Sequence, residues 1–208
     1  MTGPERLQKA RLYVVTPDRG DELLDLARAA LLGGADILQL RHKTLPRGEL
    51  LALARRLREA TTNAGAIFIV NDHVDVALIA GADGVHLGPN DISIEAARRI
   101  APEGFLIGAS ASSVEAARAA VQAGADYIGS GPAFSTPVKK EKAVIGPAGV
   151  AAVVAAVDVP VFAIGGIEGS NLAELAALGI HRACVIRAVA DAPDPEQATA
   201  RLRAMLTA

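Results

Sequence analysis

Three polar residues at alternate positions follow one another along an apolar run. The run from Ile37 to Arg41 contains Gln39 and Arg41, and Lys43 comes two residues later. Alternate side chains of an extended strand point to the same side, so one amide and two cations would face inward together. Buried cations need a compensating anion, and guanidinium groups bind phosphate oxygens well. The row therefore favours an anion-binding strand end over one that is merely solvated.

Two carboxylates follow the next two apolar runs. Asn71 and Asp72 end one run, and Asp91 comes shortly after the other in Gly88-Pro89-Asn90-Asp91. If the runs are adjacent strands, the two aspartates could share a hard divalent cation, most plausibly Mg²⁺, with positions left for phosphate oxygens. The alternative is that each aspartate caps a helix, since helical segments begin soon after both. The sequence leaves both readings open.

A third group of residues is typical of a phosphate site. Gly165 and Gly166 interrupt an apolar run, and Ile186 and Arg187 follow the last one. Bare backbone N–H groups and a helix amino terminus receive anions in such loops. The longest loop, residues 131–146, combines glycine, proline, serine and threonine with several lysines, which is the composition of an active-site loop.

Short apolar runs alternate with longer segments of helical period, which indicates successive βα units around a parallel sheet. The strands are expected at Leu12 to Thr16, Ile37 to Arg41, Ile67 to Asn71, Gly84 to Leu87, Leu106 to Ala109, Tyr127 to Ser130, Val161 to Ile164 and Ala183 to Ile186. The helical segments include Glu22 to Leu32, Glu49 to Ala60, Ile94 to Ile100, Val114 to Ala123 and Leu172 to Leu178. Eight units favour an α/β fold with one (β/α)8 TIM barrel domain over residues 1–208, although an open doubly wound sheet has the same local pattern.

The phrase Gly-Ala-Asp recurs at Gly34, Gly81 and Gly124, each time between a helical segment and a strand. A glycine in the left-handed conformation would end each helix there. No glycine-rich dinucleotide fingerprint follows the first strand, where Thr16 and Pro17 stand instead, and this weakens the open-sheet alternative. In a barrel, the polar strand ends described above would converge on one mouth.

Composition excludes several functions. The formal net charge of -2 provides no general basic surface for nucleic acid or an anionic membrane, and we expect neither partner. No stretch has the length and apolarity of a membrane span. The single cysteine, Cys184, lies in an apolar run and is expected to be buried, and one cysteine suits the reducing cytoplasm.

Taken together, these residues resemble thiamine phosphate synthase over nearly the whole chain. The matching phrases are Leu12-Tyr13-Val14-Val15-Thr16, Gln39-Leu40-Arg41-His42-Lys43, Val70-Asn71-Asp72, the segment Gly81 to Gly88, the segment Gly124 to Gly129 with Gly131-Pro132, and Ala163-Ile164-Gly165-Gly166-Ile167. The resemblance implies a transferase that joins hydroxymethylpyrimidine diphosphate to thiazole phosphate, releasing diphosphate. It also implies a dissociative mechanism and a homodimer.

The resemblance assigns roles to individual residues. Asp72 and Asp91 would bind Mg²⁺, and Arg41, Lys43 and Lys139 would stabilise the leaving diphosphate. The substrate-binding residues would be Gln39, Leu40, Arg41, His42, Lys43, Asn71, Ser110, Thr136, Pro137, Val138, Lys139, Gly166, Ile186 and Arg187. Within this set the pyrimidine diphosphate would lie near Gln39, Asn71 and Ser110, and the thiazole phosphate near Gly166 and Arg187.

Three departures from the family pattern bear on substrate affinity. Val138 stands where the family usually has threonine, Pro17 separates Thr16 from Asp18, and Ala111-Ser112 follows Ser110 in place of Thr-His. Two alternatives use the same barrel. One is a thiazole tautomerase, which relies on a histidine in the segment where Ser112 stands, and the other is a phosphate-ester-binding barrel without catalysis.

Overall fold

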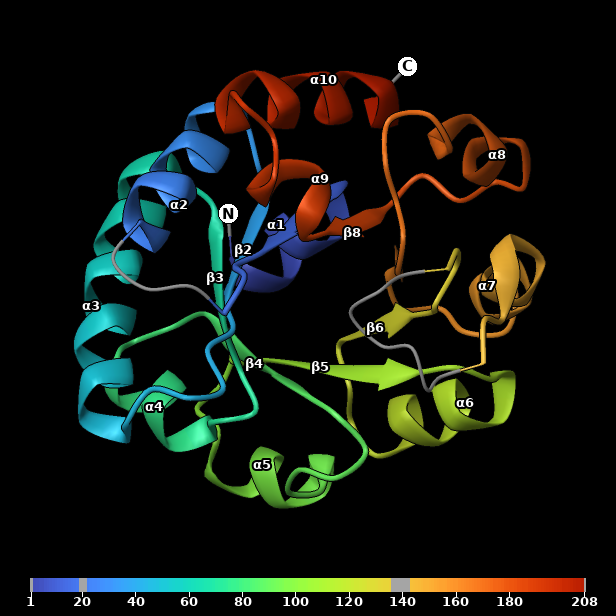
Figure 1. The fold of residues 1–208 in the computed structure, drawn as a ribbon. Helices are drawn as coiled ribbons and strands as arrows, with labels where there is room; N and C mark the ends of the chain where they lie inside the picture. Colours follow the sequence, from blue (N-terminus) through green and yellow to red (C-terminus); the bar gives the residue numbers. More distant parts are fainter. Residues whose placement is uncertain (1, 19–21, 136–142, 208) are drawn as a thin grey trace.

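The computed structural model describes residues 2–18, 22–135 and 143–207, and eight parallel strands form a closed barrel in sequential order, β1 to β8 (Figure 1). The strands are β1 (Leu12–Val15), β2 (Ile37–Leu40), β3 (Ile67–Asn71), β4 (Gly84–Leu87), β5 (Leu106–Ala111), β6 (Tyr127–Ser130), β7 (Val161–Ile164) and β8 (Ala183–Val185). The expected (β/α)8 barrel is therefore confirmed, and β1 closes it by pairing Leu12 with Ala183 of β8.

Helices surround the barrel and connect its strands (Figure 1). They are α1 (Gly3–Lys9), α2 (Leu23–Leu32), α3 (Arg47–Ala64), α4 (Val74–Ile79), α5 (Ile94–Ile100), α6 (Val114–Gln122), α7 (Gly146–Val154), α8 (Leu172–Ala177), α9 (Arg187–Ala190) and α10 (Pro195–Thr207). None of these described helices combines the length and apolarity that crossing a bilayer requires.

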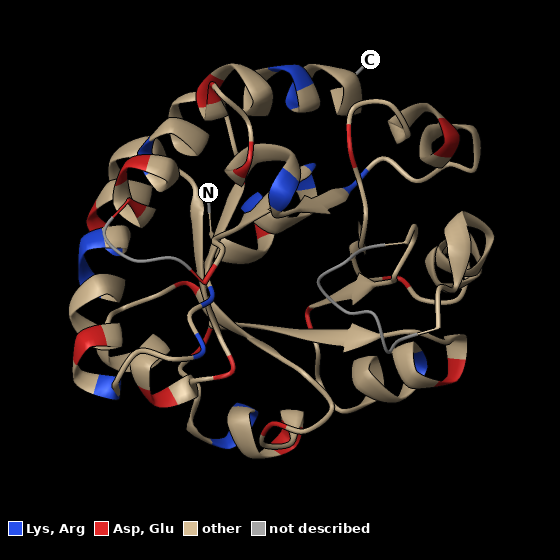
Figure 2. Cartoon of the chain, viewed as in Figure 1, with Lys and Arg blue, Asp and Glu red and all other residues tan. Residues whose placement is uncertain are grey.

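Alternation along each strand separates two cores. Leu12 and Val14 of β1 pack outward against the helices, whereas Tyr13 and Val15 fill the barrel interior with Ile37 and Phe162. Helix α1 closes the amino-terminal end of the barrel, because its Leu7 belongs to the interior cluster. The strands carry no Asp, Glu, Lys or Arg, and the charge lies on the helices and loops (Figure 2). Polar chemistry is thus confined to the strand ends and to a few uncharged interior side chains.

The repeated Gly-Ala-Asp phrase has a conformational basis. Gly34, Gly81 and Gly124 have φ of 89°, 66° and 103°, a region that side chains with a Cβ rarely adopt, so the expected left-handed ends of the helices are confirmed. The alanine and aspartate that follow lead directly into β2, β4 and β6.

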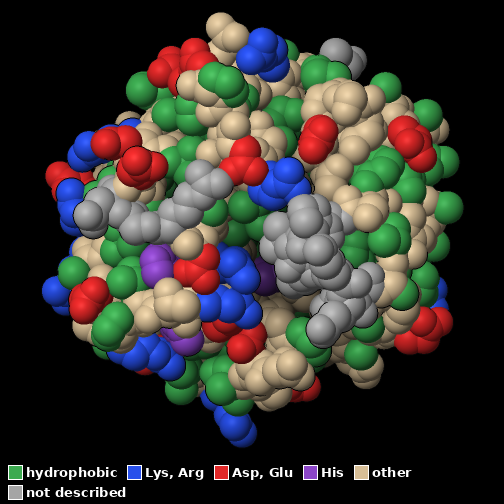
Figure 3. Space-filling view, in the orientation of Figure 1, with side chains coloured by type: hydrophobic (Ala, Val, Ile, Leu, Met, Phe, Trp, Pro, Cys, Tyr) green, Lys and Arg blue, Asp and Glu red, His purple; other side chains and the backbone are tan. Residues whose placement is uncertain are grey.

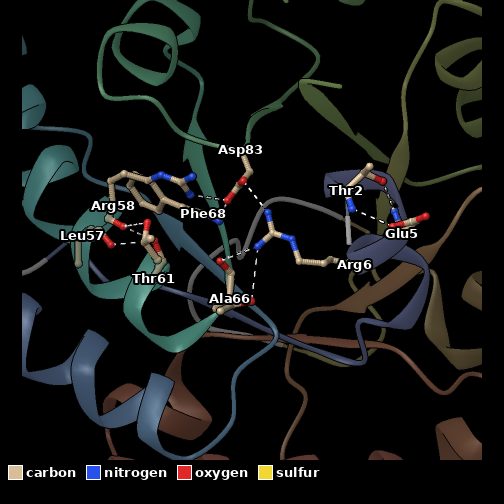
Figure 4. Close-up of polar contacts among 11 residues, drawn as sticks. Thr2, Glu5, Arg6, Leu57, Arg58, Thr61, Ala66, Phe68 and Asp83 are labelled. Carbon is tan, nitrogen blue, oxygen red and sulfur yellow. Dashed lines mark hydrogen bonds and ion pairs between the residues drawn. The ribbon is translucent and has the colours of Figure 1, made fainter. Parts of the chain in front are cut away.

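Each aspartate of the repeat holds the start of the preceding strand, and we call these contacts the aspartate clamps. Asp36 accepts the N–H of Leu12 at 2.9 Å, Asp83 that of Phe68 at 2.8 Å and Asp126 that of Ile107 at 2.7 Å. Every clamp also binds arginine: Arg203 pairs with Asp36, Arg6 and Arg58 with Asp83, and Arg98 with Asp126. Figure 4 shows the clamp at Asp83, which joins α1 and α3 to the start of β3.

Candidate active site

A cavity of about 230 Å³ opens at the carboxyl ends of β5 to β8, on the barrel face viewed in Figure 3. Its wall includes four of the residues expected to bind substrate, namely Ser110, Gly166, Ile186 and Arg187. Figure 3 shows basic and acidic side chains gathered beside the centre of this face. Thr136, Pro137, Val138 and Lys139 lie outside the described residues.

The three residues Gln39, Arg41 and Lys43 do not share one environment, because β2 ends between the first and the second of them. Gln39 is buried in the barrel interior, where its Nε2 donates to the Tyr13 hydroxyl at 2.6 Å. The strand ends at Leu40, one residue earlier than expected, so Arg41 is half-buried and Lys43 is exposed beyond it. The Gln39 amide is therefore matched by a neutral tyrosine. The two cations are the part of the row that remains available to an anion.

Neighbouring residues fix the segment that carries these cations. The Thr16 hydroxyl accepts the Arg41 N–H at 2.9 Å, and Asp18 Oδ1 accepts the Lys43 N–H at 3.1 Å. Asp18 also lies 2.9 Å from Nδ1 of His42, whose side chain is only 8% exposed. His42 thus lies in the expected segment between the two cations, and its Nδ1 also accepts the Leu45 N–H at 3.2 Å. Leu40 packs its side chain in the outer core, away from the barrel interior.

Asp72 and Asp91 lie together after β3 and β4, where they were expected. Asp72 adopts a left-handed φ of 64° and its N–H donates to His86 O at 2.9 Å, which holds it beside β4. Asp91 Oδ2 accepts the Gly88 N–H at 2.7 Å. Neither aspartate caps a helix, because Ser93 caps α5 and the start of α4 has no side-chain cap. The capping alternative is thus excluded.

Burial raises the pKa of the Asp72 carboxyl, and the adjacent Asp91 raises this pKa further by hydrogen bonding and by charge. Lys43 and then His73 act in the opposite direction and lower it. Two carboxylates held together in this way destabilise each other unless a cation lies between or beside them. Lys43 from the β2 side already provides part of that compensation.

The donor set of this carboxylate pair fits Mg²⁺. Magnesium in phosphate-handling sites is usually held by one or two carboxylates, with phosphate and water completing its octahedron. Within the described part of the chain there is no group of three or more His, Cys, Asp or Glu that could enclose a metal. A magnesium site built from Asp72 and Asp91 would therefore depend on oxygen atoms from a bound phosphate and from water, as is typical of phosphate-handling magnesium sites.

A chain of hydrogen bonds crosses the barrel interior beneath the site. From Gln39 it passes to Tyr13, whose hydroxyl oxygen lies 2.9 Å from that of Tyr127. The Tyr127 hydroxyl lies 3.3 Å from Nδ1 of His86, and Nε2 of that histidine lies 2.9 Å from Ser110 Oγ. Ser110 lines the cavity, so these hydrogen bonds link Gln39 of β2 with the cavity at the end of β5. Gly108 makes room for Tyr127, since a Cβ there would overlap the ring.

The β7 end is shaped by two glycines in left-handed conformations, Gly165 at φ 101° and Gly166 at φ 63°. A Cβ on Gly166 would lie 2.5 Å from Ser135 O, so only glycine allows the chain after β6 to approach this closely. Asn171 fixes the turn, because its Nδ2 donates to Gly166 O at 2.8 Å. Ile186 and Arg187, the first residue of α9, line the same cavity as Gly166.

Sequence reasoning missed three residues of this arrangement. The partners of Tyr127 are distant in sequence, and no local pattern reports them, whereas Asn171 donates to Gly166 only five residues before it. Asp18 was noted only as a displaced aspartate after Pro17, yet it binds His42 and the Lys43 backbone. A search for acidic residues opposite the cationic row would have identified it.

The family model described as thiamine monophosphate synthase matches residues 12–189. The chain is 50% identical to the thiamine-phosphate synthase of Methanoculleus marisnigri over 201 residues, which cover 95% of both chains. It is 43% identical to the thiamine-phosphate synthase of Pyrococcus horikoshii over 199 residues, with 96% of both chains covered.

Solved structures agree with these relationships. The thiamine phosphate pyrophosphorylase from Pyrococcus furiosus matches with a TM-score of 0.90 and 42% identity over 98% of both chains. A 3-hexulose-6-phosphate synthase matches with a TM-score of 0.74 at 20% identity, covering 94% of this chain and 99% of its own, and shares the fold alone. Since the family matches span nearly its whole length, the chain belongs to the thiamine monophosphate synthase family and is a transferase.

Proposed function

We propose that this enzyme joins 4-amino-2-methyl-5-hydroxymethylpyrimidine diphosphate to 4-methyl-5-(2-phosphooxyethyl)thiazole, forming thiamine phosphate and diphosphate. The observation that carries the proposal is the Asp72–Asp91 pair beside Lys43, at the same barrel mouth as the Ser110–Gly166 cavity. Family membership supports the reaction class, and the proposal of two anion-binding regions rests on the cations beside the carboxylate pair and on the glycine turn at the cavity.

The substrates are proposed to occupy different sides of the mouth. The diphosphate lies near Arg41, Lys43 and Asn71, with Lys139 contributing a further charge, and Ser110 contacts the pyrimidine at the end of the buried hydrogen-bond chain. The thiazole phosphate lies against Gly166, Ile186 and Arg187, together with Thr136, Pro137 and Val138.

The reaction is proposed to be dissociative. The bond between the methylene carbon and the diphosphate oxygen breaks first, both electrons leave with diphosphate, and the thiazole nitrogen then donates a pair to the resulting pyrimidine methylene cation. Arg41, Lys43 and Lys139 favour this departure because their fixed charges meet the negative charge that grows on diphosphate. Mg²⁺, held by Asp72 and Asp91, would supply Lewis acidity toward the same oxygens when bound. No protein nucleophile is required.

The direct test is formation of thiamine phosphate by purified protein from the two substrates, first with Mg²⁺ and then with EDTA. We expect product with Mg²⁺, loss of product with EDTA, and recovery when excess Mg²⁺ is added back. Product that persists at full rate in EDTA would contradict the metal assignment. If circular dichroism shows that the protein is folded and no product forms under any condition, the tautomerase or the binding-only alternative would be favoured instead.

Two further proposals accompany this function. The family resemblance implies a homodimer, which light scattering of the purified protein tests. A cytoplasmic location suits the single buried cysteine, and cell fractionation tests it.

A further inference from the structure

Strand β8, the fourth even-numbered strand, lacks the aspartate that forms a clamp before β2, β4 and β6. Asp36, Asp83 and Asp126 each stand directly before the first residue of β2, β4 or β6, but Arg182 stands in that place before β8. The turn also differs, because Gly179, with φ of 75°, precedes Arg182 by three residues rather than two. A cation therefore occupies the position where the other three strands carry an anion.

Arg182 is poorly compensated where it lies. Its Nη2 donates to Gln8 O at 2.9 Å, but its buried Nε has no hydrogen-bond partner among the described residues. Arg11 is adjacent, since Ala183 N donates to Arg11 O at 2.9 Å in the β1–β8 pairing. Burial, and then the charge of Arg11, lower the pKa of the Arg182 guanidinium. A desolvated cation beside another cation favours an anion as its third neighbour.

A hollow of about 220 Å³ adjoins this guanidinium, and we call it the Arg182 hollow. It is lined by Gln8, Asp158, Pro160, Gly179, His181 and Arg182, among others. These residues precede β7 and β8 or belong to α1, so the hollow lies at the amino-terminal end of the barrel, opposite the active site. Asp158 is exposed on its wall and forms no ion pair with Arg182 among the described contacts.

We propose that the Arg182 hollow binds a small oxyanion of the phosphate class, held by the Arg182 guanidinium with Arg11 contributing charge. The planar guanidinium of Arg182 carries its two Nη donors side by side, which matches two oxygens of a phosphate, whereas its buried Nε is shielded from solvent. A divalent phosphate also suits two neighbouring guanidinium groups better than a monovalent carboxylate does, because each cation then finds a negative charge. The inference is independent of the proposed function, since it uses none of the active-site residues.

Arginine Nε–Hε signals in NMR spectra test the site directly. Inorganic phosphate is titrated into the full-length protein against sodium chloride at matched ionic strength, with the Arg182 signal assigned from its loss in Arg182→Gln. We expect a saturable shift of the Arg182 signal with phosphate alone. Because the active site also attracts phosphate, the titration is repeated in Arg41→Ala, where the Arg182 shift should persist. Equal shifts with phosphate and chloride, or loss of the shift in Arg41→Ala, would overturn the proposal.

Two variants provide a second, quantitative readout through the Arg11 Nε–Hε signal. Arg182→Lys keeps the charge but removes the fork, and should weaken phosphate binding about tenfold, the effect of one lost charged hydrogen bond. Asp158→Asn removes an exposed negative charge from the hollow and should tighten binding. The second variant changes an exposed side chain, so it keeps the test decisive if Arg182→Lys fails to fold. An unchanged phosphate affinity in Asp158→Asn would count against the site.

Discussion

Asp72 is the residue in which backbone strain and proposed function coincide. Within the described residues it is the one non-glycine residue with positive φ, a conformation that costs about 1 kcal/mol for most side chains. The bond from its N–H to His86 O holds the turn, which places the carboxyl beside Asp91 rather than at the start of α4. Such strain is retained where surrounding contacts enforce it, and here it brings two carboxylates together.

Replacing the charge at either side of the diphosphate site should slow the reaction strongly. We expect Asp72→Asn and Arg41→Ala each to lower kcat/KM for thiamine phosphate formation by at least about a hundredfold, as loss of charge stabilisation at a leaving group does. Asparagine is preferred at position 72 because it tolerates the left-handed conformation that alanine would strain. Initial rates with saturating Mg²⁺ measure the effect.

Asp75→Asn and Arg47→Ala provide matched controls for these charge changes. Asp75 and Arg47 form an exposed ion pair at the start of α3 and α4, with 62% and 57% of their side chains exposed. Both controls should keep near-normal kcat/KM, since exposed pairs contribute little to stability and neither residue has a proposed role in the reaction. Near-normal rates in Asp72→Asn and Arg41→Ala as well would refute the proposed mechanism.

Residue types and spacing predicted the meeting of Asp72 with Asp91, because strand ends of a parallel barrel share one mouth. Spacing could not exclude capping, since that depends on the φ of Asp72 and on Ser93 taking the cap of α5. The partner of Gln39 was equally hidden. An interior strand position predicts burial, but the tyrosine that meets the amide comes from another strand.

At the scale of the elements, periodicity placed the strands well but did not mark the four-residue helix α9. β3, β4, β6 and β7 begin and end at the expected residues. α9 has only four residues, which is too short for a 3.6-residue period to emerge, and no helix was expected there. The Gly-Ala-Asp repeat predicted the left-handed glycines at the helix ends. It did not predict the aspartate clamps, because the arginines that bind each aspartate come from other helices.

The aspartate clamps should contribute stability without affecting chemistry. Asp83 accepts hydrogen bonds from Arg6, Arg58 and the Phe68 N–H, and its side chain is 11% exposed. Asp83→Ala leaves two guanidinium groups and a backbone donor without their acceptor, and should lower the free energy of unfolding by about 3 kcal/mol. Urea denaturation measures this loss. The kcat of the folded variant should stay near normal, because the clamp lies at the amino-terminal end of the barrel.

Asp25→Ala is the control for this loss of a carboxylate. Asp25 pairs with Arg28 on the outside of α2, and 84% of its side chain is exposed. Its removal should change the free energy of unfolding by no more than about 0.5 kcal/mol. If Asp83→Ala and Asp25→Ala cost the same, the clamps do not hold the strand starts.

For the whole molecule, the number of βα units predicted barrel closure, whereas the contents of the barrel depended on register. Tyr13, Tyr127 and Phe162 come from β1, β6 and β7 and meet in the interior with ring centroids 5.4 to 5.9 Å apart. Such contacts require each strand to be tilted and shifted relative to its neighbours, and no local pattern encodes that shift. The closed fold therefore buries Tyr13 against Tyr127, a pairing that could not be predicted from the local sequence around either residue.

The tyrosine pair provides a spectroscopic reporter of the intact barrel. Tyr13 and Tyr127 are the only tyrosines of the chain, which contains no tryptophan, so tyrosinate absorbance reports these two hydroxyls alone. Burial raises the pKa of both well above the ordinary value of 10.0. The charge of Tyr127 adds to this effect at Tyr13, whereas the Tyr13 hydrogen bond opposes it at Tyr127. The folded chain should therefore show no tyrosinate absorbance at about pH 10, where the urea-unfolded chain is half ionised.

The same difference makes the barrel unstable to alkali. Below the unfolded pKa of about 10 both states keep the phenolic protons, and the stabilisation is fully present. As the pH rises from there toward the folded values, only the unfolded chain releases protons, so each tyrosine lowers the free energy of unfolding by about 1.4 kcal/mol per pH unit. Tyrosinate absorbance should appear together with the loss of circular dichroism, in one transition. Absorbance that rises near pH 10 while the helical signal stays intact would mean that solvent reaches the barrel interior, contrary to its closure by α1.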